Sequence, residues 1–299
     1  MSKHEQPLFA FFGTPRFGVV VLNALEAHGM LPALVITSPD KPQGRGLEVL
    51  PSPVKQWALE RGIDVLTPPT LKDEQLVAEL KNSEWDVFVV AAYNKLIPKT
   101  VLEIPKHGCL NVHPSLLPKF RGPSPALSAI LADERITGVS VMLMNEKMDE
   151  GPVVAQARIA LEEEEPGSAP GDGWPPKGSE FEELLAQEGG NLLAETIPFW
   201  MSGQITPEPQ DDAQATYSKK FSSEDALVDI HGDPKKELCK IRAFDKNPRA
   251  FYFAEKNGKK IRVIITDATL EGGVLKILKV IPEGKKEMPY EDFIKGFTN

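Results

Sequence analysis

Residues 8–15 read Leu8-Phe9-Ala10-Phe11-Phe12-Gly13-Thr14-Pro15, and this short segment sets the architecture expected for most of the chain. Five apolar residues closed by a glycine indicate a strand that is buried on both faces. We expect a helix to follow directly and to end at His28-Gly29, with Thr14 as its cap and Pro15 in its first turn. A buried strand followed by a helix is the unit from which parallel α/β sheets are built.

The same unit recurs up to Met201. Apolar runs predict strands at Ala33–Thr37, Asp64–Leu66, Asp86–Ala92, Gly108–His113 and Gly138–Met144. Helical segments are predicted at Val54–Arg61, Glu74–Lys81, Pro125–Ala132 and Phe181–Met201. The stretch Ser38–Pro53 is too polar and too often interrupted by proline and glycine to predict an element. This alternation is typical of a Rossmann-like α/β domain with a mainly parallel sheet, which we expect over residues 1–201.

The pattern changes after Met201. Residues 202–216 contain two prolines and three acidic residues, and we expect them to form a linker. The remaining residues, 217–299, predict a helix and three strands, at Lys235–Phe244, Phe251–Ala254, Lys260–Thr266 and Gly273–Ile281, with Asn257-Gly258 as a hairpin turn. We expect this part to be a smaller domain with an OB-like β-barrel.

Composition and charge exclude several classes of protein. Apolar residues make up 41% of the 299, as in soluble globular proteins. The two cysteines, Cys109 and Cys239, exclude a disulfide scaffold and a zinc ribbon. No apolar run approaches the ~20 residues of a membrane helix, and the polar N-terminus lacks the core of a secretory signal. We therefore expect a cytoplasmic protein.

The net charge of −9 is unevenly distributed, with −14 over residues 1–230 and +5 over residues 231–299. A basic module on an acidic body favours an anionic partner for that module, although a merely soluble lysine-rich domain has the same charge.

The strongest signal for chemistry is Asn111-Val112-His113-Pro114-Ser115-Leu116-Leu117-Pro118, which begins near the end of a predicted strand. Residues two apart on a strand lie on one face, so Asn111 and His113 point the same way. An amide that stabilises an oxyanion, next to an imidazole that moves protons, suits attack on a carbonyl group. Asp149 follows the next strand and reaches His113 if the two strands are neighbours. A structural histidine and a surface aspartate fit the same residues.

Two glycine-containing segments lie near the same predicted edge. Gly13–Gly18 lacks the spacing of a dinucleotide-binding loop, so Gly13 serves the strand-to-helix turn. Arg45 stands between Gly44 and Gly46 in the inserted stretch, where glycine neighbours let its side chain reach a phosphate. A solvated surface loop has the same composition.

Together these segments resemble the methionyl-tRNA formyltransferase family over nearly the whole chain. The resemblance rests on Phe12–Pro15, Ser38–Lys55, Asn111–Pro118 with Arg121-Gly122, Thr137–Met142, Met148–Gly151, Thr216–Lys220 and Ile241–Phe244. The Asn-x-His signature is that of folate-dependent formyltransferases, and the inserted loop and C-terminal motifs narrow the resemblance to the tRNA enzymes.

This resemblance implies formyl transfer from 10-formyltetrahydrofolate to the α-amino group of methionyl-initiator tRNA, for translation initiation, by a monomer that needs no metal and no membrane. By this resemblance residues 1–201 form the catalytic domain, in which Asn111, His113 and Asp149 occupy the family's catalytic positions. The implied folate positions are Tyr93, Asn94, Lys95, Leu96, Ile97, Ser115, Leu116, Leu117 and Pro118. The inserted loop and the basic domain 217–299 supply the expected tRNA contacts, Lys41, Arg45, Lys219, Lys220, Arg242 and Arg249.

The sequence departs from the family at three places. Asn94 stands where the family usually has glycine, and because asparagine tolerates left-handed geometry better than most residues, we expect the loop to be kept. Residues 166–177 resemble an insertion, and the chain is short between Ile265 and Lys285.

Other functions remain open at this point. They are formylation of an amino sugar nucleotide or of glycinamide ribonucleotide, hydrolysis of the same donor to formate, and non-catalytic nucleotide binding by an RNA-associated protein. The sugar and ribonucleotide relatives lack the Arg45 loop, and the agreement of three catalytic residue types argues against the non-catalytic alternative.

Overall fold

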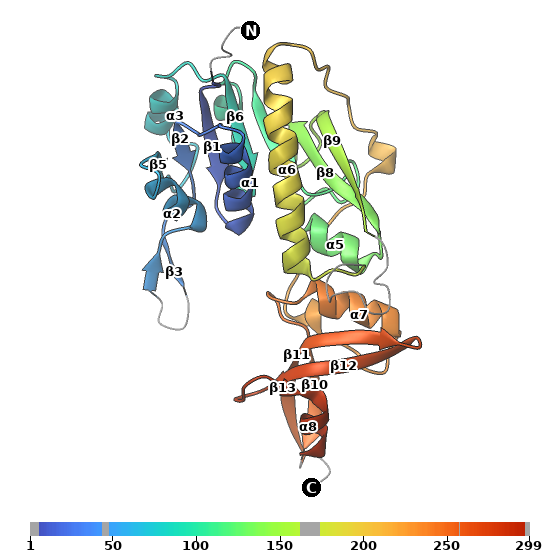
Figure 1. Cartoon of the computed structure of the whole chain (residues 1–299). Helices are drawn as coiled ribbons and strands as arrows, with labels where there is room; N and C mark the ends of the chain where they lie inside the picture. The colour runs from blue at the N-terminus through green and yellow to red at the C-terminus, as the bar shows by residue number, and fades with distance from the viewer. Residues whose placement is uncertain (1–5, 44–47, 162–173, 257, 297–299) are drawn as a thin grey trace. The chain divides into compact units, whose positions relative to one another are not determined.

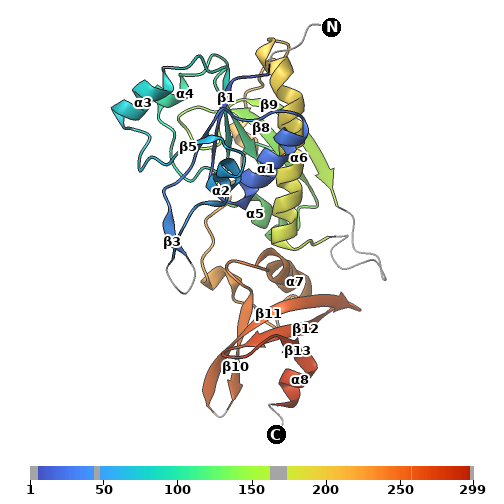
Figure 2. The ribbon, with the colours of Figure 1, turned by 60° about the vertical axis from the view of Figure 1, so that its left-hand side comes forward.

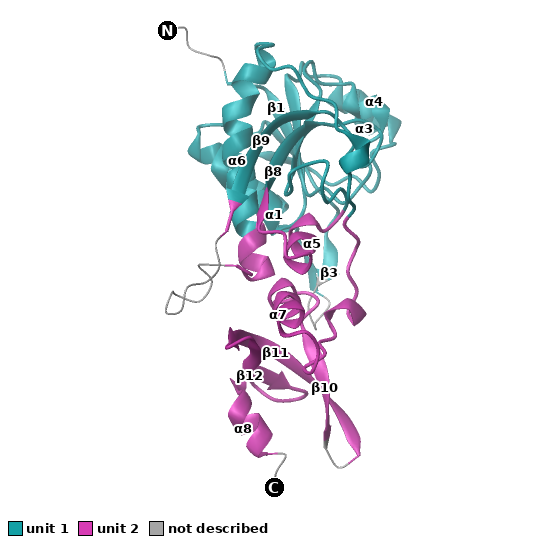
Figure 3. Ribbon diagram, turned by 90° about the vertical axis from the view of Figure 1, so that its right-hand side faces the viewer, with its two compact units in different colours: residues 1–122, 138–159, 183–217 teal, residues 123–137, 160–182, 218–299 magenta. Residues whose placement is uncertain are grey.

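The computed structural model describes residues 6–43, 48–161, 174–256 and 258–296 (Figure 1). The chain divides into two compact units (Figure 3). Unit 1 is residues 1–122, 138–159 and 183–217, and unit 2 is residues 123–137, 160–182 and 218–299. The expected division into a catalytic part, 1–201, and a tRNA-binding part, 217–299, concerns function and stays a prediction.

Unit 1 is built on a seven-stranded sheet with the order β5-β2-β1-β6-β7-β8-β9. The strands are β1 (Phe9–Gly13), β2 (Leu34–Ile36), β5 (Asp64–Leu66), β6 (Val87–Ala91), β7 (Cys109–His113), β8 (Ile136–Leu143) and β9 (Val153–Ala160). All pairs from β5 to β7 are parallel, and β8 is antiparallel to β7. This confirms the predicted Rossmann-like class.

Helices cover both faces of this sheet (Figures 1 and 2). Helices α1 (Arg16–Ala27), α2 (Pro53–Leu59) and α6 (Gly178–Met201) share a core with Phe9 and Phe11. Helices α3 (Glu74–Leu80) and α4 (Lys99–Leu102) share the opposite core with Ala10 and Phe12. The apolar run of β1 serves both cores because alternate side chains of a strand point to opposite faces. None of the helices in the described residues is long and apolar enough to cross a membrane.

Gly189, in the middle of α6, allows this helix to lie close to strand β7. A Cβ on Gly189 would lie 2.4 Å from Cγ1 of Val112 in β7. The missing side chain therefore lets the helix backbone lie directly against the strand that carries Asn111 and His113.

Most predicted elements of unit 1 are confirmed, with three differences. Thr14 does not cap α1, because its hydroxyl lies 3.2 Å from that of Ser38 and no side chain caps the helix. The stretch Ser38–Pro53 contains a hairpin of β3 (Lys41–Gln43) and β4 (Glu48–Leu50), which the pattern misses because β4 is wholly exposed. Helix α4 and strand β9 are further elements that the sequence pattern does not indicate.

Unit 2 contains a four-stranded antiparallel sheet of β10 (Phe251–Lys256), β11 (Lys259–Glu271), β12 (Val274–Pro282) and β13 (Met288–Pro289). It also holds helices α5 (Pro125–Leu131), α7 (Pro234–Ala243) and α8 (Tyr290–Lys295), and the 3-10 turn η2 (Glu224–Ala226), whereas the turn η1 (Asp212–Gln214) belongs to unit 1. The smaller β-rich part is confirmed as an antiparallel sheet, with β10 and β13 at its ends. Asn257 of the predicted hairpin turn lies outside the described residues, as does most of the 166–177 segment.

Candidate active site

Strand β7 carries Asn111 and His113 to the carboxyl end of the parallel strands. In the ladder, Asn111 lies opposite Val90 of β6 and Met142 of β8, and His113 lies opposite Ser140. Asn111 is half-buried, and His113 is 4% exposed. Open α/β sheets bind their ligands beyond this edge. The structure thus places both residues where the sequence pattern expects chemistry.

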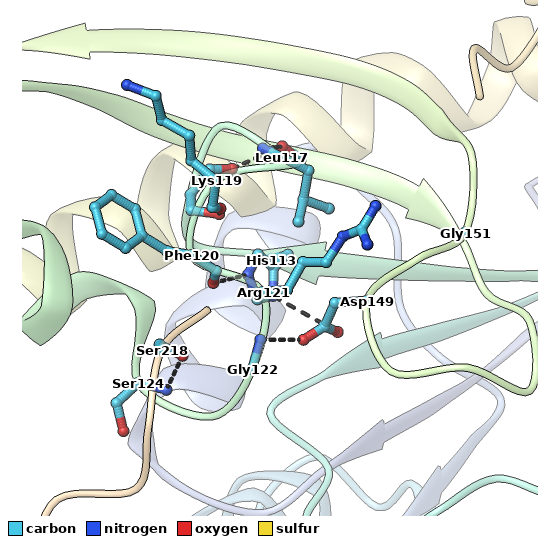
Figure 4. A network of polar contacts seen from close by, with 12 residues as sticks. His113, Leu117, Lys119, Phe120, Arg121, Gly122, Ser124, Asp149, Gly151 and Ser218 are labelled. Atoms are coloured by element: carbon cyan, nitrogen blue, oxygen red, sulfur yellow. Dashed lines mark hydrogen bonds and ion pairs between the residues drawn. The ribbon is translucent and has the colours of Figure 1, made fainter. Parts of the chain in front are cut away.

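The two ring nitrogens of His113 have different neighbours (Figure 4). Nε2 lies 3.0 Å from the carbonyl oxygen of Phe120, and Nδ1 lies 3.8 Å from Oδ1 of Asp149. A carbonyl oxygen only accepts, so Nε2 is the nitrogen that carries the hydrogen. Nδ1 is therefore the position at which the ring takes up a further proton, and the protonated ring forms an ion pair with Asp149.

Asp149 lies in the loop between β8 and β9, and strand pairing brings it to His113 as expected. Its Oδ2 accepts a 2.7 Å hydrogen bond from the Gly122 N–H, which leaves Oδ1 facing the imidazole (Figure 4). Its φ of 54° is in the left-handed region. Aspartate tolerates this conformation better than most residues do.

Hydrogen bonds fix the turn 115–118 next to His113. The Ser115 hydroxyl donates to the Lys119 carbonyl at 2.6 Å, and the Ser140 hydroxyl donates to the Ser115 carbonyl at 2.6 Å. The Leu117 N–H donates to the same Ser140 hydroxyl, and Gln156 donates to the Leu117 carbonyl. Ser115 and Leu117 are buried, whereas Leu116 and Pro118 are half-buried. These hydrogen bonds hold the turn in place next to His113.

The second expected folate segment, Tyr93–Ile97, follows β6. Leu96 is 73% exposed and Ile97 is buried, while the ring of Tyr93 packs edge-on against Phe12. Burial raises the pKa of Tyr93 to about 12. The left-handed residue here is Ala92, with φ 52°, and not Asn94, so Asn94 fits at this position without that conformation.

A hollow of about 200 Å³ opens at the carboxyl ends of β1 and β2. Its lining includes Thr14, Ser38, Ser52, Lys41 and Asn94. Its lining therefore contains both Asn94, which is expected to bind folate, and Lys41, which is expected to bind tRNA. Lys95 belongs to the same region: burial and the positive charge of Lys41 lower the pKa of its ammonium group. Arg45 lies outside the described residues.

The expected tRNA contacts of the basic region differ in exposure. Lys219 and Lys220 are exposed, and Lys219 pairs with Asp225. Arg249 lines a hollow of about 430 Å³ in unit 2, together with Lys177, Asp245, Lys246, Thr266 and Glu287. Arg242 is only 5% exposed, so its assignment as a phosphate contact stays a prediction that this burial does not favour.

Sequence reasoning missed the groups that surround the site. The Phe120 carbonyl and the Gly122 N–H are backbone groups, and only the neighbouring Arg121-Gly122 motif signals their place. Gln210 bonds to the Asp149 loop but lies in the stretch expected to be a linker, where no sequence signal marks it. Among the described residues, no three His, Cys, Asp or Glu side chains are grouped so that they could hold a metal ion.

The fold and the site first define a class. This is a Rossmann-like enzyme that holds an amide, an imidazole and a carboxylate at the carboxyl edge of its sheet, a set suited to attack on a carbonyl carbon. Residues 7–168 match the formyl transferase family model. The methionyl-tRNA formyltransferase of Thermodesulfovibrio yellowstonii is 35% identical over 96% of this chain and 94% of its own, and that of Thermus thermophilus is 37% identical over 96% and 95%. The chain therefore belongs to the formyl transferase family, and within it to the methionyl-tRNA formyltransferases.

Solved structures support the fold. An N-formyltransferase from Helicobacter canadensis, in complex with folinic acid and dTDP-3-aminofucose, has a TM-score of 0.60 and 16% identity over 89% of each chain. A methionyl-tRNA formyltransferase from Clostridium thermocellum has a TM-score of 0.57 and 16% identity over 95% of this chain and 99% of its own.

Proposed function

We propose that the protein transfers the formyl group of 10-formyltetrahydrofolate to the α-amino group of methionine on initiator tRNA, for translation initiation. Its full-length similarity to methionyl-tRNA formyltransferases supports this function. The observation that carries the proposal is the distance of 3.8 Å between Nδ1 of His113 and Oδ1 of Asp149. His113 lies on β7, the strand that also carries Asn111.

The reaction that we propose follows from the two environments of the His113 nitrogens. The neutral amine attacks the formyl carbon, a C–N bond forms, and the carbonyl electron pair moves onto oxygen. Asn111 donates its amide N–H to this oxyanion. Nδ1 of His113 takes the proton of the amine, since Nε2 already donates to Phe120, and Asp149 pairs with the charged ring. When the carbonyl re-forms, the bond to the folate nitrogen breaks, and that nitrogen takes the proton from His113.

The folate contacts that we propose are the turn Ser115–Pro118 and the loop Tyr93–Ile97. Hydrogen bonds already hold the turn in place, so it does not need to become ordered when folate binds. In the loop, the 73% exposed Leu96 is apolar surface that a pterin or benzoyl ring can cover. These positions fit a flat donor placed beside Asn111.

The tRNA contacts that we propose come from two basic regions. Lys41 lines the hollow beside the β3–β4 hairpin, and Arg45 lies in the sequence between these strands. In unit 2 we propose Lys219, Lys220 and Arg249, and we add Lys246 because it lines the same hollow as Arg249. Lysine and arginine side chains bind phosphates of an RNA backbone by charge, so these contacts set affinity more than sequence preference.

We also propose that the enzyme acts as a monomer in the cytoplasm, since one chain supplies all three catalytic candidates. The test of the function is formation of N-formylmethionyl-tRNA from the purified protein, the donor and charged initiator tRNA. The same tRNA with an acetylated α-amino group serves as the control. Formylation of the free amine alone supports the proposal, and no formylation of either tRNA contradicts it.

A further inference from the structure

Gln210 makes three hydrogen bonds to the surroundings of Asp149. Its amide nitrogen donates to the carbonyl oxygens of Asp149 at 2.8 Å and of Gly151 at 2.7 Å. Its Oε1 accepts a 3.0 Å hydrogen bond from Nε of Arg121. Both amide donors and the amide oxygen are thus used. Gln210 is half-buried in a stretch where most residues are exposed, so it is part of unit 1 rather than of a free linker.

Arg121 determines which way the Gln210 amide points. Its side chain is 1% exposed, and its Nη2 donates to Oδ1 of Asp212 at 2.7 Å. A guanidinium group has donors only, so it binds Gln210 through the amide oxygen. The amide nitrogen is therefore directed at the two loop carbonyls, and the contact has one orientation.

The loop that carries Asp149 needs to be held. Asp149 has a left-handed φ of 54°, which aspartate tolerates better than most residues but which still costs free energy, so contacts that fix the loop help to keep it. Gly151 approaches β8 so closely that a Cβ would lie 1.9 Å from the carbonyl oxygen of Leu143. Gln210 binds the carbonyls on either side of Glu150, so it fixes the backbone between these two constrained positions.

We propose that Gln210 is a positioning residue for Asp149. It holds the loop so that one carboxylate oxygen faces His113 while the other accepts from Gly122. Gln210 bonds to the backbone of the loop and to the Arg121 side chain, and not to the side chains of Asn111 or His113, so its direct contact with the catalytic candidates is through the loop that carries Asp149. The kinetic part of the test rests on the proposed function, whereas the structural part does not.

The kinetic test uses Gln210→Met, which keeps the side-chain length and removes all three hydrogen bonds. We expect kcat to fall about 10-fold, with the KM for the donor and for charged tRNA within about twofold of wild type. In an Asp149→Asn background the same substitution should lower kcat less than about twofold, because no carboxylate charge is left to position. Equal losses in both backgrounds, or an unchanged kcat in the single variant, would overturn the proposal.

Two further variants separate this role from general destabilisation. Gln214→Met is the matched control, since Gln214 lies on the same segment but bonds to Asp211, and its kcat should stay at the wild-type value. Gln210→Glu keeps an oxygen for Arg121 and removes the donors to the loop, so we expect it to lose kcat as Gln210→Met does. Wild-type kcat in Gln210→Glu would show that the loop contacts are not the ones that matter.

Hydrogen exchange at the Gly122 amide tests the positioning without the reaction. This N–H donates to Oδ2 of Asp149, so release of the loop should speed its exchange at least about fivefold in Gln210→Met and not in Gln214→Met. Unchanged exchange in Gln210→Met would overturn the proposal. Wild-type protein that is inactive on charged tRNA would instead contradict the proposed function, and the exchange result would still decide the role of Gln210.

Discussion

Asp149 presents one carboxylate oxygen to each of two partners, with Oδ2 2.7 Å from the Gly122 nitrogen and Oδ1 3.8 Å from Nδ1 of His113. The variant Asp149→Asn keeps an oxygen that can accept from Gly122 but has no charge to pair with the imidazolium. We expect kcat to fall about 100-fold. The thermal unfolding midpoint should stay at the wild-type value. Steady-state kinetics with a melting curve checks this, and a kcat within about threefold of wild type would contradict the role of Asp149.

Asn111 is the oxyanion donor in the proposed reaction, so Asn111→Ala should lower kcat by ~10²–10³ while changing the KM for charged tRNA little. Asn191→Ala is the matched control, because the side-chain oxygen of Asn191 accepts a hydrogen bond from Gln187 on the same helix, α6. The measurement is single-turnover formylation with saturating donor. A loss that appeared only in KM would assign Asn111 to binding instead.

The hollow beside Arg249 should contribute to tRNA affinity through phosphate contacts. The double variant Lys246→Ala, Arg249→Ala should weaken tRNA binding and reduce the slope of log affinity against log salt by about 2. Lys276→Ala should leave the slope unchanged, since Lys276 is not among the residues that line the hollow. Filter binding between low and physiological salt measures this, and equal slopes for wild type and double variant would exclude the hollow as a contact.

The inserted hairpin should serve the tRNA rather than the donor. Arg45→Ala and Lys41→Ala should raise the KM for charged tRNA, whereas release of formate from the donor in the absence of tRNA should not change. The reason is that these cations can bind phosphates only when the tRNA is present. Lys99→Ala, on α4 and near Glu103, is the control. Equal impairment of both reactions would place the hairpin in the folate site.

Cys109 should be inert in the folded protein. Burial raises the pKa of its thiol to about 12 from a usual value of 9.0, so the reactive thiolate is about 1000-fold scarcer at pH 8 than in the unfolded chain. Because the folded pKa is the higher one, this group favours the folded state below about pH 9 and loses that effect as the pH rises towards 12. Mass spectrometry of iodoacetamide labelling checks this. Labelling of Cys109 at the same rate with and without denaturant would contradict its burial.

The sequence allowed the parallel sheet to be predicted because its strands are continuous apolar runs. It also placed His113 at the end of one predicted strand and Asp149 after the next, so that the two meet if these strands are neighbours; the structure supplies that pairing. The exposed β3–β4 hairpin could not be predicted in this way, since the pattern detects only strands that bury a face.

Two residues show where sequence reasoning stops. Counting charges cannot distinguish an exposed from a buried cation, so the charge pattern groups Arg242, which is 5% exposed, with the exposed Lys219. Gln210 binds backbone carbonyls that are distant in sequence, and carbonyl groups leave no mark on residue type. Such contacts depend on how the loops pack in three dimensions, and that information is not contained in any local pattern.

The most direct test of the account follows a labelled formyl group from 10-formyltetrahydrofolate to its acceptor. The protein is given charged initiator tRNA, a dTDP-linked amino sugar or no acceptor in parallel reactions, and the tRNA product is hydrolysed to release its amino acid. We predict that the label appears as N-formylmethionine, and that Asn111→Ala and Asp149→Asn reduce its rate of appearance by about 100-fold or more. Label recovered on the sugar nucleotide or as free formate, with none on the methionine, would contradict the account.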